Sequence, residues 1–264
     1  MSVLGHRLRA YRQPAAAGSW TPAELPSLVV WYDADTAGDF TLSGSDITQW
    51  NDKSGNARHL TNTGTVTRQT AVQNGRAVAR FTAASSAYLQ YFNASAWMTS
   101  SQVGFGWVGK MTSSTNSNGR LAAMTAENGS RDYETSANAI LGNRDSSNQA
   151  LSCNVATAAP TALSVTYNTW FVESLDVTSG TLSLRVNGGT ANTVASSPSF
   201  TTKRFRVGAG IAAGADFWDG DMGEIVLTST ITSTNREKLE GYLAWRWGLQ
   251  ANLPGGHPYA GGAP

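Results

Sequence analysis

The stretch "TLSLRVNGG", Thr181 to Gly189, carries the clearest fold signal in this chain of 264 residues. Its apolar residues Leu182, Leu184 and Val186 alternate with polar ones, and this period of two is typical of a β-strand with one buried face. Asn187-Gly188 follows, and both residue types tolerate the positive φ angles of a type I′ hairpin turn. The stretch therefore predicts a β-hairpin.

Short runs of the same kind recur on both sides of this hairpin. They cover residues 27–34, 47–52, 77–82, 87–92, 103–111, 120–126, 161–167, 170–177, 205–210 and 223–229. Turn residues separate them, and no helical repeats intervene. Roughly a dozen short strands in this pattern favour an all-β, two-sheet antiparallel sandwich whose inner faces supply the core.

One helical pattern lies near the C-terminus and includes the tryptophan-rich stretch "EGYLAWRWGL", residues 240–249. Thr234 and Glu237 have the spacing of a capping box, and Gly248 is a typical C-terminal stop. The apolar stripe of this helix consists of Leu239, Tyr242, Leu243 and Trp247. So wide a stripe favours burial over a free ligand platform. We expect the helix to seal one edge of the sandwich, with Trp245 beside the stripe covering a second surface.

The first 19 residues differ from the rest and are predicted to form a basic arm and linker ahead of a globular domain spanning 20–264. The candidate docking residues of the arm are Leu4, Leu8 and Tyr11, at helical spacing, and Arg7, Arg9 and Arg12 beside them. A disordered terminus is the alternative. No apolar segment of a secretory signal follows the arginines, so we expect synthesis in a cytoplasm without export by a signal peptide.

Composition excludes several classes of function. The formal net charge of +1 shows no excess of basic residues of the kind that nucleic-acid binding requires. The longest apolar run, Leu28 to Tyr32, is far shorter than the roughly 20 residues of a membrane span. Cys153 is the single cysteine, which we expect to be a small buried hydrophobe. His6, His59 and His257 share no zinc-ligand spacing. No G-x-S-x-G elbow or Walker loop is present.

Three passages resemble a concanavalin A-like lectin domain of the laminin-G type, in the variety common in bacteriophage virion proteins and large bacterial surface proteins. The first, 28–64, contains W-x-D-A-D from Trp31 and W-x-D-x-S-G-N from Trp50. The second comprises the strands of 181–229, and the third is the terminal helix and tail, 235–259. The resemblance implies a jelly-roll sandwich that attaches to sugars or other proteins and lacks catalysis.

Asp33 and Asp35 in the first passage are the calcium candidates of this resemblance, because calcium-binding members use acidic ligands on one rim. An EF-hand reading fails at its third ligand, Ala37, and at its twelfth position, Gly44, where a bidentate glutamate belongs. We therefore expect no cofactor. Calcium is the alternative to a structural role in which the two aspartates cap turns through Asx hydrogen bonds.

A glycoside hydrolase is the enzymatic alternative. Asp219, Asp221 and Glu224 imitate the E-x-D-x-x-E strand of some jelly-roll hydrolases, in which two carboxylates project into one cleft. The laminin-G resemblance gives another interpretation of these three residues, as part of a turn that leads into the strand at 223–229. We expect no enzyme, since hydrolysis would require Glu224 and Asp219 to face a cleft.

Glycan binding has diffuse support in the loops. Residues 111–120, 142–149 and 208–220 offer the amide, carboxyl, hydroxyl and aromatic groups that bind sugars. The candidate ligand residues are Asn143, Arg144, Asp216 and Trp218. The alternative is that these are solvated loops with Trp218 buried.

The family resemblance, together with the lack of a signal-peptide pattern and the separate basic arm, implies a non-enzymatic phage virion component: a capsid decoration, head-fibre or tail-associated protein. We expect its arm to dock on capsid or tail subunits through charge-assisted arginine contacts, and the chain to be a homo-oligomer on the particle. We expect no membrane insertion. The alternative function is a carbohydrate-binding adhesin module that recognises host-surface glycans.

Overall fold

The structure is a computed structural model and describes residues 20–112, 118–126, 135–144, 150–211 and 216–264. Within these residues the chain forms nineteen β-strands and one α-helix, α1 (Ser233–Arg246). Four short 3-10 helices connect them: η1 (Pro22–Glu24), η2 (Ala37–Asp39), η3 (Ala83–Ser85) and η4 (Gln250–Asn252). The predicted all-β class, with antiparallel strands and one C-terminal helix, is confirmed.

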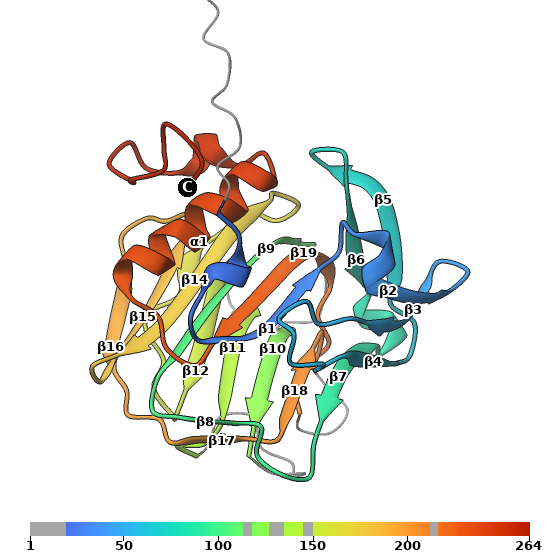
Figure 1. Cartoon of the computed structure of the whole chain (residues 1–264), viewed down its shortest axis with the longest axis horizontal. Coiled ribbons are helices and arrows are strands. Elements are labelled where there is room, and N and C mark those ends of the chain that lie inside the picture. Colours follow the sequence, from blue (N-terminus) through green and yellow to red (C-terminus); the bar gives the residue numbers. More distant parts are fainter. Residues whose placement is uncertain (1–19, 113–117, 127–134, 145–149, 212–215) are drawn as a thin grey trace, which may run out of the picture.

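Eight strands form the layer next to α1, which we call the helix-side layer (Figure 1). In hydrogen-bonded order they are β5 (Thr67–Gln73), β6 (Arg76–Phe81) with β1 (Leu28–Asp33), β19 (Gly220–Thr228), β9 (Val103–Met111), β14 (Phe171–Thr178), β15 (Thr181–Val186) and β16 (Asn192–Ala195). β19 lies at the centre, because its first half pairs with β6, its second half with β1, and its other edge with β9.

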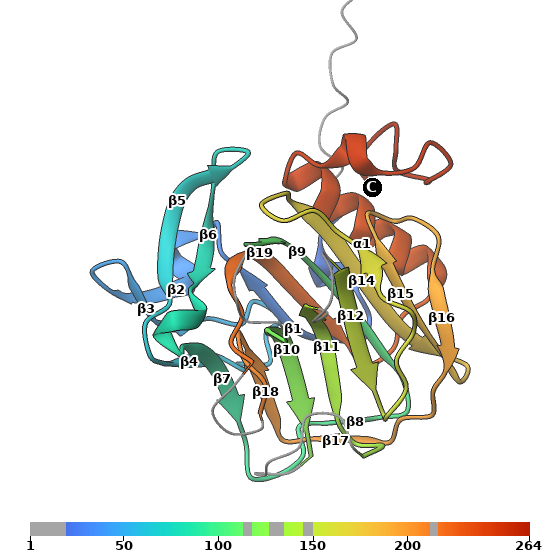
Figure 2. The ribbon, with the colours of Figure 1, turned by 180° about the vertical axis from the view of Figure 1, so that it is seen from behind.

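Seven strands form the opposite layer, seen from behind in Figure 2, which we call the far layer. They are β4 (Leu60–Thr63), β7 (Tyr88–Phe92), β18 (Arg204–Val207), β10 (Arg120–Thr125), β11 (Ala139–Arg144), β12 (Ala150–Val155) and β13 (Leu163–Ser164). At one edge β2 (Phe40–Ser43) and β3 (Asp46–Trp50) join the layers, since β3 pairs with both β4 and β5. Hydrogen bonding thus makes one 17-stranded sheet, and β8 (Met98–Ser100) pairs separately with β17 (Phe200–Thr202).

The main core fills the space between the layers. Alternate residues of each strand point into it, as the period of two predicts. In β9, Phe105 and Trp107 face inward, while in β18 Phe205 does the same. Cys153 is also fully buried there, which confirms its predicted packing role.

A second core lies between the helix-side layer and α1, and it explains the tryptophan-rich stretch. Leu239, Leu243 and Trp247 of the helix are buried against valines of the layer. Gly106 of β9 allows the close approach, because a Cβ there would lie 2.7 Å from the Leu239 side chain. The predicted burial of the stripe is confirmed for these three residues, while Tyr242 is half-buried. The helix packs against β9 and β14 inside the layer, so the prediction that it seals an edge of the sandwich is wrong. The predicted capping box at Thr234 is wrong: Thr232 caps the helix by accepting the Asn235 N–H at 3.2 Å.

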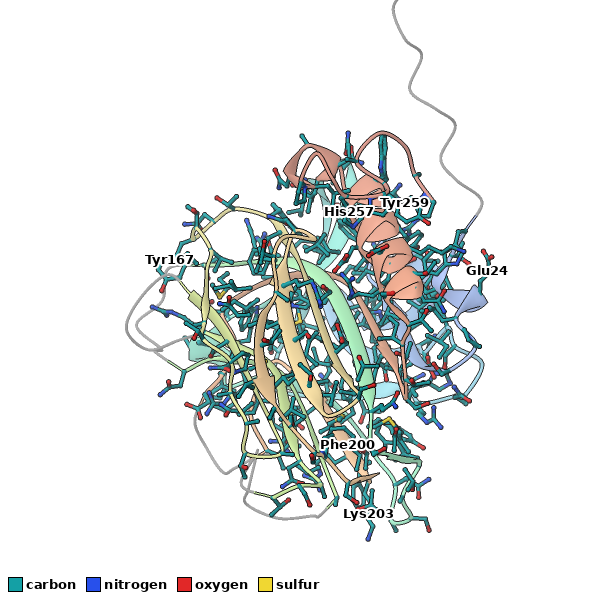
Figure 3. All side chains as sticks on the ribbon, turned by 90° about the vertical axis from the view of Figure 1, so that its left-hand side faces the viewer. Glu24, Tyr167, Phe200, Lys203, His257 and Tyr259 are labelled. Atoms are coloured by element: carbon teal, nitrogen blue, oxygen red, sulfur yellow. The ribbon has the colours of Figure 1, made fainter. Side chains whose placement is uncertain are left out.

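The tail after α1 is held against the helix by a buried charge cluster. His257 lies 3.1 Å from the Glu240 carboxylate, and Arg236 pairs with the same carboxylate at 3.0 Å. Figure 3 shows the labelled His257 and Tyr259 beside the helix. Burial opposes ionisation of Glu240, but the hydrogen bond from His257 and the charge of Arg236 outweigh it, so the pKa of this carboxyl is lowered.

The hairpin residues of the opening stretch also behave as predicted, with one difference. Asn187 and Gly188 have φ angles of 53° and 65°, and the Gly189 N–H donates to the Val186 carbonyl at 3.0 Å. These are the positive φ angles of the expected turn. The paired strands end at Leu184 and Asn192, so the connection is longer than a two-residue hairpin.

Candidate functional site

The structure brings Asn143, Arg144 and Asp216 of the four predicted glycan residues to Gly119 and Arg120, and we call these residues the Arg120 group. The Arg144 N–H donates to the Gly119 carbonyl at 2.9 Å. Asn143 pairs with Arg120 across β10 and β11, and the Arg120 N–H donates to the Asp216 carbonyl at 2.8 Å. Asp216 also lies 3.4 Å from the Arg120 guanidinium. Arg144 donates to the Tyr167 hydroxyl at 2.7 Å. Asn143 and Arg144 were predicted in a loop, but they end strand β11, and Asn143 is buried.

Trp218 does not belong to this group as a ligand contact. It is 1% exposed and makes an edge-to-face contact with Trp107, at 5.6 Å between ring centroids. Because neither face of its ring is open, its predicted stacking on a sugar is wrong, and it is a core residue instead.

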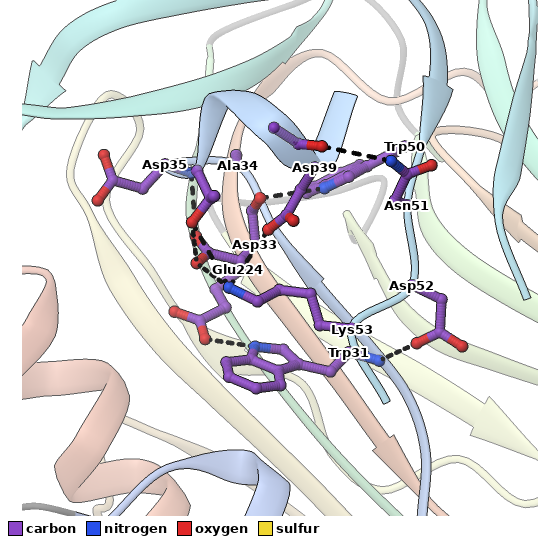
Figure 4. A network of polar contacts seen from close by, with 12 residues as sticks. Trp31, Asp33, Ala34, Asp35, Asp39, Trp50, Asn51, Asp52, Lys53 and Glu224 are labelled. Atoms are coloured by element: carbon purple, nitrogen blue, oxygen red, sulfur yellow. Dashed lines mark hydrogen bonds and ion pairs between the residues drawn. The ribbon is translucent and has the colours of Figure 1, made fainter. Parts of the chain in front are cut away.

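The first passage of the family resemblance forms a polar network around Asp33 (Figure 4), and Arg246 at the end of α1 joins it. Asp33, at the end of β1, accepts from Lys53 at 3.0 Å and from Arg246 at 2.8 Å. Its other oxygen accepts the Asp35 N–H at 3.0 Å, so the predicted Asx cap is confirmed for Asp33. Burial opposes ionisation of Asp33, but Arg246 and Lys53 outweigh it and lower its pKa.

Asp35 has a different role from the predicted turn cap. Its carboxylate pairs with Arg76 and accepts the Ala77 N–H at 3.2 Å, which ties β6 to the turn after β1. Cationic side chains therefore neutralise Asp33 and Asp35. No cluster of three or more histidine, cysteine or acidic side chains suited to a metal ion occurs in the described part of the chain.

Glu224 of β19 lies under this network and is fully buried. Its carboxylate accepts the Trp31 indole N–H at 2.6 Å and the Tyr242 hydroxyl at 2.9 Å. Trp247 donates at 3.1 Å, and Arg246 forms an ion pair at 3.1 Å. Burial, with Asp33 nearby, raises the pKa of Glu224 to about 7.

The hydrolase arrangement is not formed. Glu224 has no open face toward a cleft, and Asp221 is buried and paired with Arg80 and Lys110 at 2.6 and 3.2 Å. Asp219, the other carboxylate that the prediction requires, is half-buried. Because Glu224 is enclosed, the predicted pair does not face one cleft, as the acid and base groups of glycoside hydrolysis must.

Above the network a pocket of about 480 Å³ opens beside the end of α1, and we call it the helix-end pocket. Four aromatic side chains line it: Trp20, Trp31, Tyr242 and Trp245. Charged and polar groups complete it: Asp33, Thr36, Lys53, Asn74, Arg76 and Arg246. The remaining wall is Thr21, Ala263 and Pro264.

The aromatic walls of the helix-end pocket are held in place by specific contacts. Tyr242 meets Trp20 edge to face at 5.8 Å between centroids, and the Lys53 ammonium lies 4.6 Å from the Trp31 ring centroid. The Trp245 indole N–H donates to the Tyr259 carbonyl at 2.8 Å. Rings fixed in this way present preformed surfaces to a ligand.

Sequence reasoning missed most of this pocket. The position of Trp245 beside the helix stripe is one signal for it, whereas Lys53 occupies an unspecified position of the motif that begins at Trp50. Arg76 had no signal, because its proximity to Asp35 comes from the pairing of distant strands.

No protein-family model matches the chain, and no curated protein matches it. Solved structures do resemble it. Domain 4 of AbnA, a GH43 extracellular arabinanase from Geobacillus stearothermophilus in complex with arabinotriose, is 14% identical with a TM-score of 0.56, covering 81% of this chain and 98% of that domain.

Two further similar structures are chains that extend well beyond the part aligned with this protein. A GH54 α-L-arabinofuranosidase is 15% identical with a TM-score of 0.58, covering 76% of this chain and 51% of that one. The receptor-binding domain of botulinum neurotoxin mosaic serotype C/D is 10% identical with a TM-score of 0.56, covering 81% and 51%. The chain thus spans about half of each. At these identities the likeness shows a shared all-β fold.

The remaining predictions on location concern the N-terminus and membranes. Leu4, Leu8, Tyr11, Arg7, Arg9 and Arg12 all lie outside the described residues. Among the helices that the structure describes, none is long and apolar enough to cross a membrane.

Proposed function

We propose that this chain is a carbohydrate-binding module and that its ligand occupies the helix-end pocket. The observation that carries the proposal is the gathering of aromatic rings and paired charged groups in one preformed pocket. Sugars offer apolar ring faces that stack on aromatic side chains and hydroxyls that both donate and accept hydrogen bonds. The pocket volume, about 480 Å³, lies within the range of small-ligand sites.

The charges of the pocket favour a neutral ligand. Lys53 pairs with Asp33 and Asp39, at 3.0 and 3.2 Å, and Arg76 and Arg246 are paired with carboxylates as well. A charged ligand would have to break these pairs. Hydroxyl groups can instead bridge them, accepting from the cations and donating to the carboxylates.

The finer architecture belongs to the same proposal. The resemblance of three passages to laminin-G-type lectins supports a concanavalin A-like jelly roll in which the two layers act as the two sheets of a sandwich. The likeness to a domain solved in complex with arabinotriose supports a glycan ligand. An adhesin module on a particle or cell surface would use such a pocket directly.

Titration of arabinotriose, cellotriose, maltotriose and galactose, followed by calorimetry and by the indole N–H signals in NMR spectra, tests the proposal. We expect Trp245→Ala to weaken binding at least about tenfold, which corresponds to about 1.4 kcal/mol. The matched control is Tyr167→Ala, since Tyr167 is a half-buried aromatic residue beside Arg144. If only Tyr167→Ala abolishes binding, the binding site is at the Arg120 group and not in the helix-end pocket. If no sugar of the panel binds, the proposal is refuted.

The virion role stays a separate prediction. It depends on the arm, residues 1–19, and on docking to capsid or tail subunits as a homo-oligomer. Deletion of residues 1–18 should abolish incorporation into particles and leave the folded domain intact. Incorporation of the truncated chain at the wild-type level would refute the docking role of the arm.

A further inference from the structure

A second feature lies on the outer face of β3 and the adjoining far layer, where a row of polar side chains crosses four strands. Gln49 of β3 pairs with Thr61 of β4, Thr61 pairs with Gln90 of β7, and Gln90 pairs with Arg206 of β18. Residues directly opposite one another in a sheet share a face. Their neighbours Trp50, Leu60 and Phe205 are buried in the core, so the row faces outward.

Aromatic rings border this row. Tyr88 and Phe92 lie two residues on either side of Gln90 and therefore share its face. Phe92 is 42% exposed, and it is one of only two exposed large hydrophobic residues in the described part of the chain. The Arg204 guanidinium lies 4.9 Å from its ring centroid and orients it.

A groove of about 350 Å³, which we call the Phe92 groove, opens beside this ring. It is lined by Gln49, Ala57, His59, Thr61, Gln90, Tyr91 and Phe92. Its lining therefore contains no acidic, lysine or arginine side chain, in contrast to the helix-end pocket.

Hydrogen bonds to neighbouring residues hold three polar side chains of the groove and leave some of their donors and acceptors without a partner among the described residues. Arg206 donates to the Gln90 carbonyl oxygen at 3.2 Å, which leaves the Gln90 amide N–H groups without a partner among the described residues. Gln49 donates to Asn51 at 2.7 Å, which leaves its carbonyl oxygen as an acceptor. His59 accepts the Asp52 N–H through Nδ1 at 3.1 Å, so its Nε2 carries the proton as a donor when the ring is neutral.

We propose that the Phe92 groove is a second binding site, which takes one neutral sugar unit stacked on Phe92. The ring supplies the apolar platform, while Gln49, Gln90 and His59 offer the mixed acceptors and donors that a set of hydroxyls satisfies. This inference shares the ligand class of the proposed function but not its site. The chain then binds glycans at two places, on the helix-side and far layers, which favours avid attachment to a multivalent surface.

NMR titration of the full chain with arabinotriose, cellotriose, maltotriose and galactose separates the two sites. The side-chain amide signals of Gln49 and Gln90 report the Phe92 groove, and the Trp245 indole signal reports the helix-end pocket. We expect Phe92→Ala to weaken binding at the groove at least about tenfold and to leave the Trp245 response unchanged. The matched control is Leu42→Ala, because Leu42 is the other exposed large hydrophobic residue described, at 39%.

The outcomes distinguish this inference from the proposed function. Ligand-induced shifts of the glutamine signals support the groove if Phe92→Ala abolishes them and Leu42→Ala retains them. This holds whether or not the Trp245 signal shifts. If the Trp245 signal shifts and the glutamine signals do not, the proposed site at the Phe92 groove is refuted and the helix-end pocket is supported. Glutamine signals that shift as much in Phe92→Ala as in the wild-type chain also refute the groove. If no sugar of the panel shifts the signals of either site, both proposals are refuted.

Discussion

Replacing Asp33 by asparagine tests how the polar network around this residue contributes to stability. One carboxylate oxygen accepts the Asp35 N–H at 3.0 Å. The other accepts from Lys53 at 3.0 Å, from Arg246 at 2.8 Å and from the Thr36 hydroxyl at 3.1 Å. All four partners are donors. Whichever way an asparagine amide is turned, its own N–H groups face at least one of them.

The magnitude follows from the two charged bonds. A hydrogen bond to a charged group contributes about 1.5 to 3 kcal/mol, so losing two could cost up to about 6 kcal/mol. Lys53 and Arg246 are 25% and 23% exposed, which lets water replace part of the loss. Both also keep another carboxylate partner, Asp39 and Glu224. We therefore expect Asp33→Asn to lower the free energy of unfolding by about 3 kcal/mol.

Urea unfolding followed by tryptophan fluorescence measures this difference, with Asp39→Asn as the matched control. Asp39 is more exposed than Asp33 and pairs only with Lys53 among the described residues, so its loss should cost under about 1 kcal/mol. The folded-state pKa of Asp33 is lowered, so its contribution is present above about pH 4 and lost as the pH falls through the folded value. Equal costs for the two variants at about pH 7, or a deficit that persists in acid, would refute the reasoning.

Two further predictions concern buried positions. Gly223→Ala should lower the free energy of unfolding by about 1 to 3 kcal/mol in urea titrations, because a Cβ would lie 2.7 Å from the rigid Trp247 ring. Gly255→Ala, where no atom lies within 4 Å, should be nearly neutral; equal effects would exclude the steric explanation. Burial raises the pKa of Glu173 well above its usual range, with the Trp107 hydrogen bond offsetting only part of this rise. Its contribution is therefore present below about pH 4 and declines by up to about 1.4 kcal/mol per pH unit as the pH rises toward the folded value. Glu173→Gln should remove this decline in unfolding titrations across pH, and an unchanged slope would contradict it.

The strands that could be predicted are those with long, clean alternation. All eleven runs identified from the sequence contain a strand. The missed strands include β11 and β12, whose sequences mix small and polar residues. In β11, Asn143 read as a loop residue, yet pairing with Arg120 and Ser152 on both sides buries it within the sheet.

The candidate site was less predictable, because exposure and proximity decide it. Trp218 and Trp245 are each followed by a charged residue, but the first is enclosed between the layers and the second lines a pocket. Gln49, Thr61 and Gln90 lie far apart in sequence, and only their register in adjacent strands makes a row of them.

The sequence by itself determined the all-β class, the turn at Asn187-Gly188 and the burial of the C-terminal helix, because each depends on the period, propensity or φ angles of a few neighbouring residues. The tertiary structure decided which charges pair with Asp33, which tryptophan is open, and where polar groups meet Phe92. These outcomes depend on strand order and register, which bring together side chains separated by tens or hundreds of residues. The binding chemistry of this chain lies in those long-range contacts.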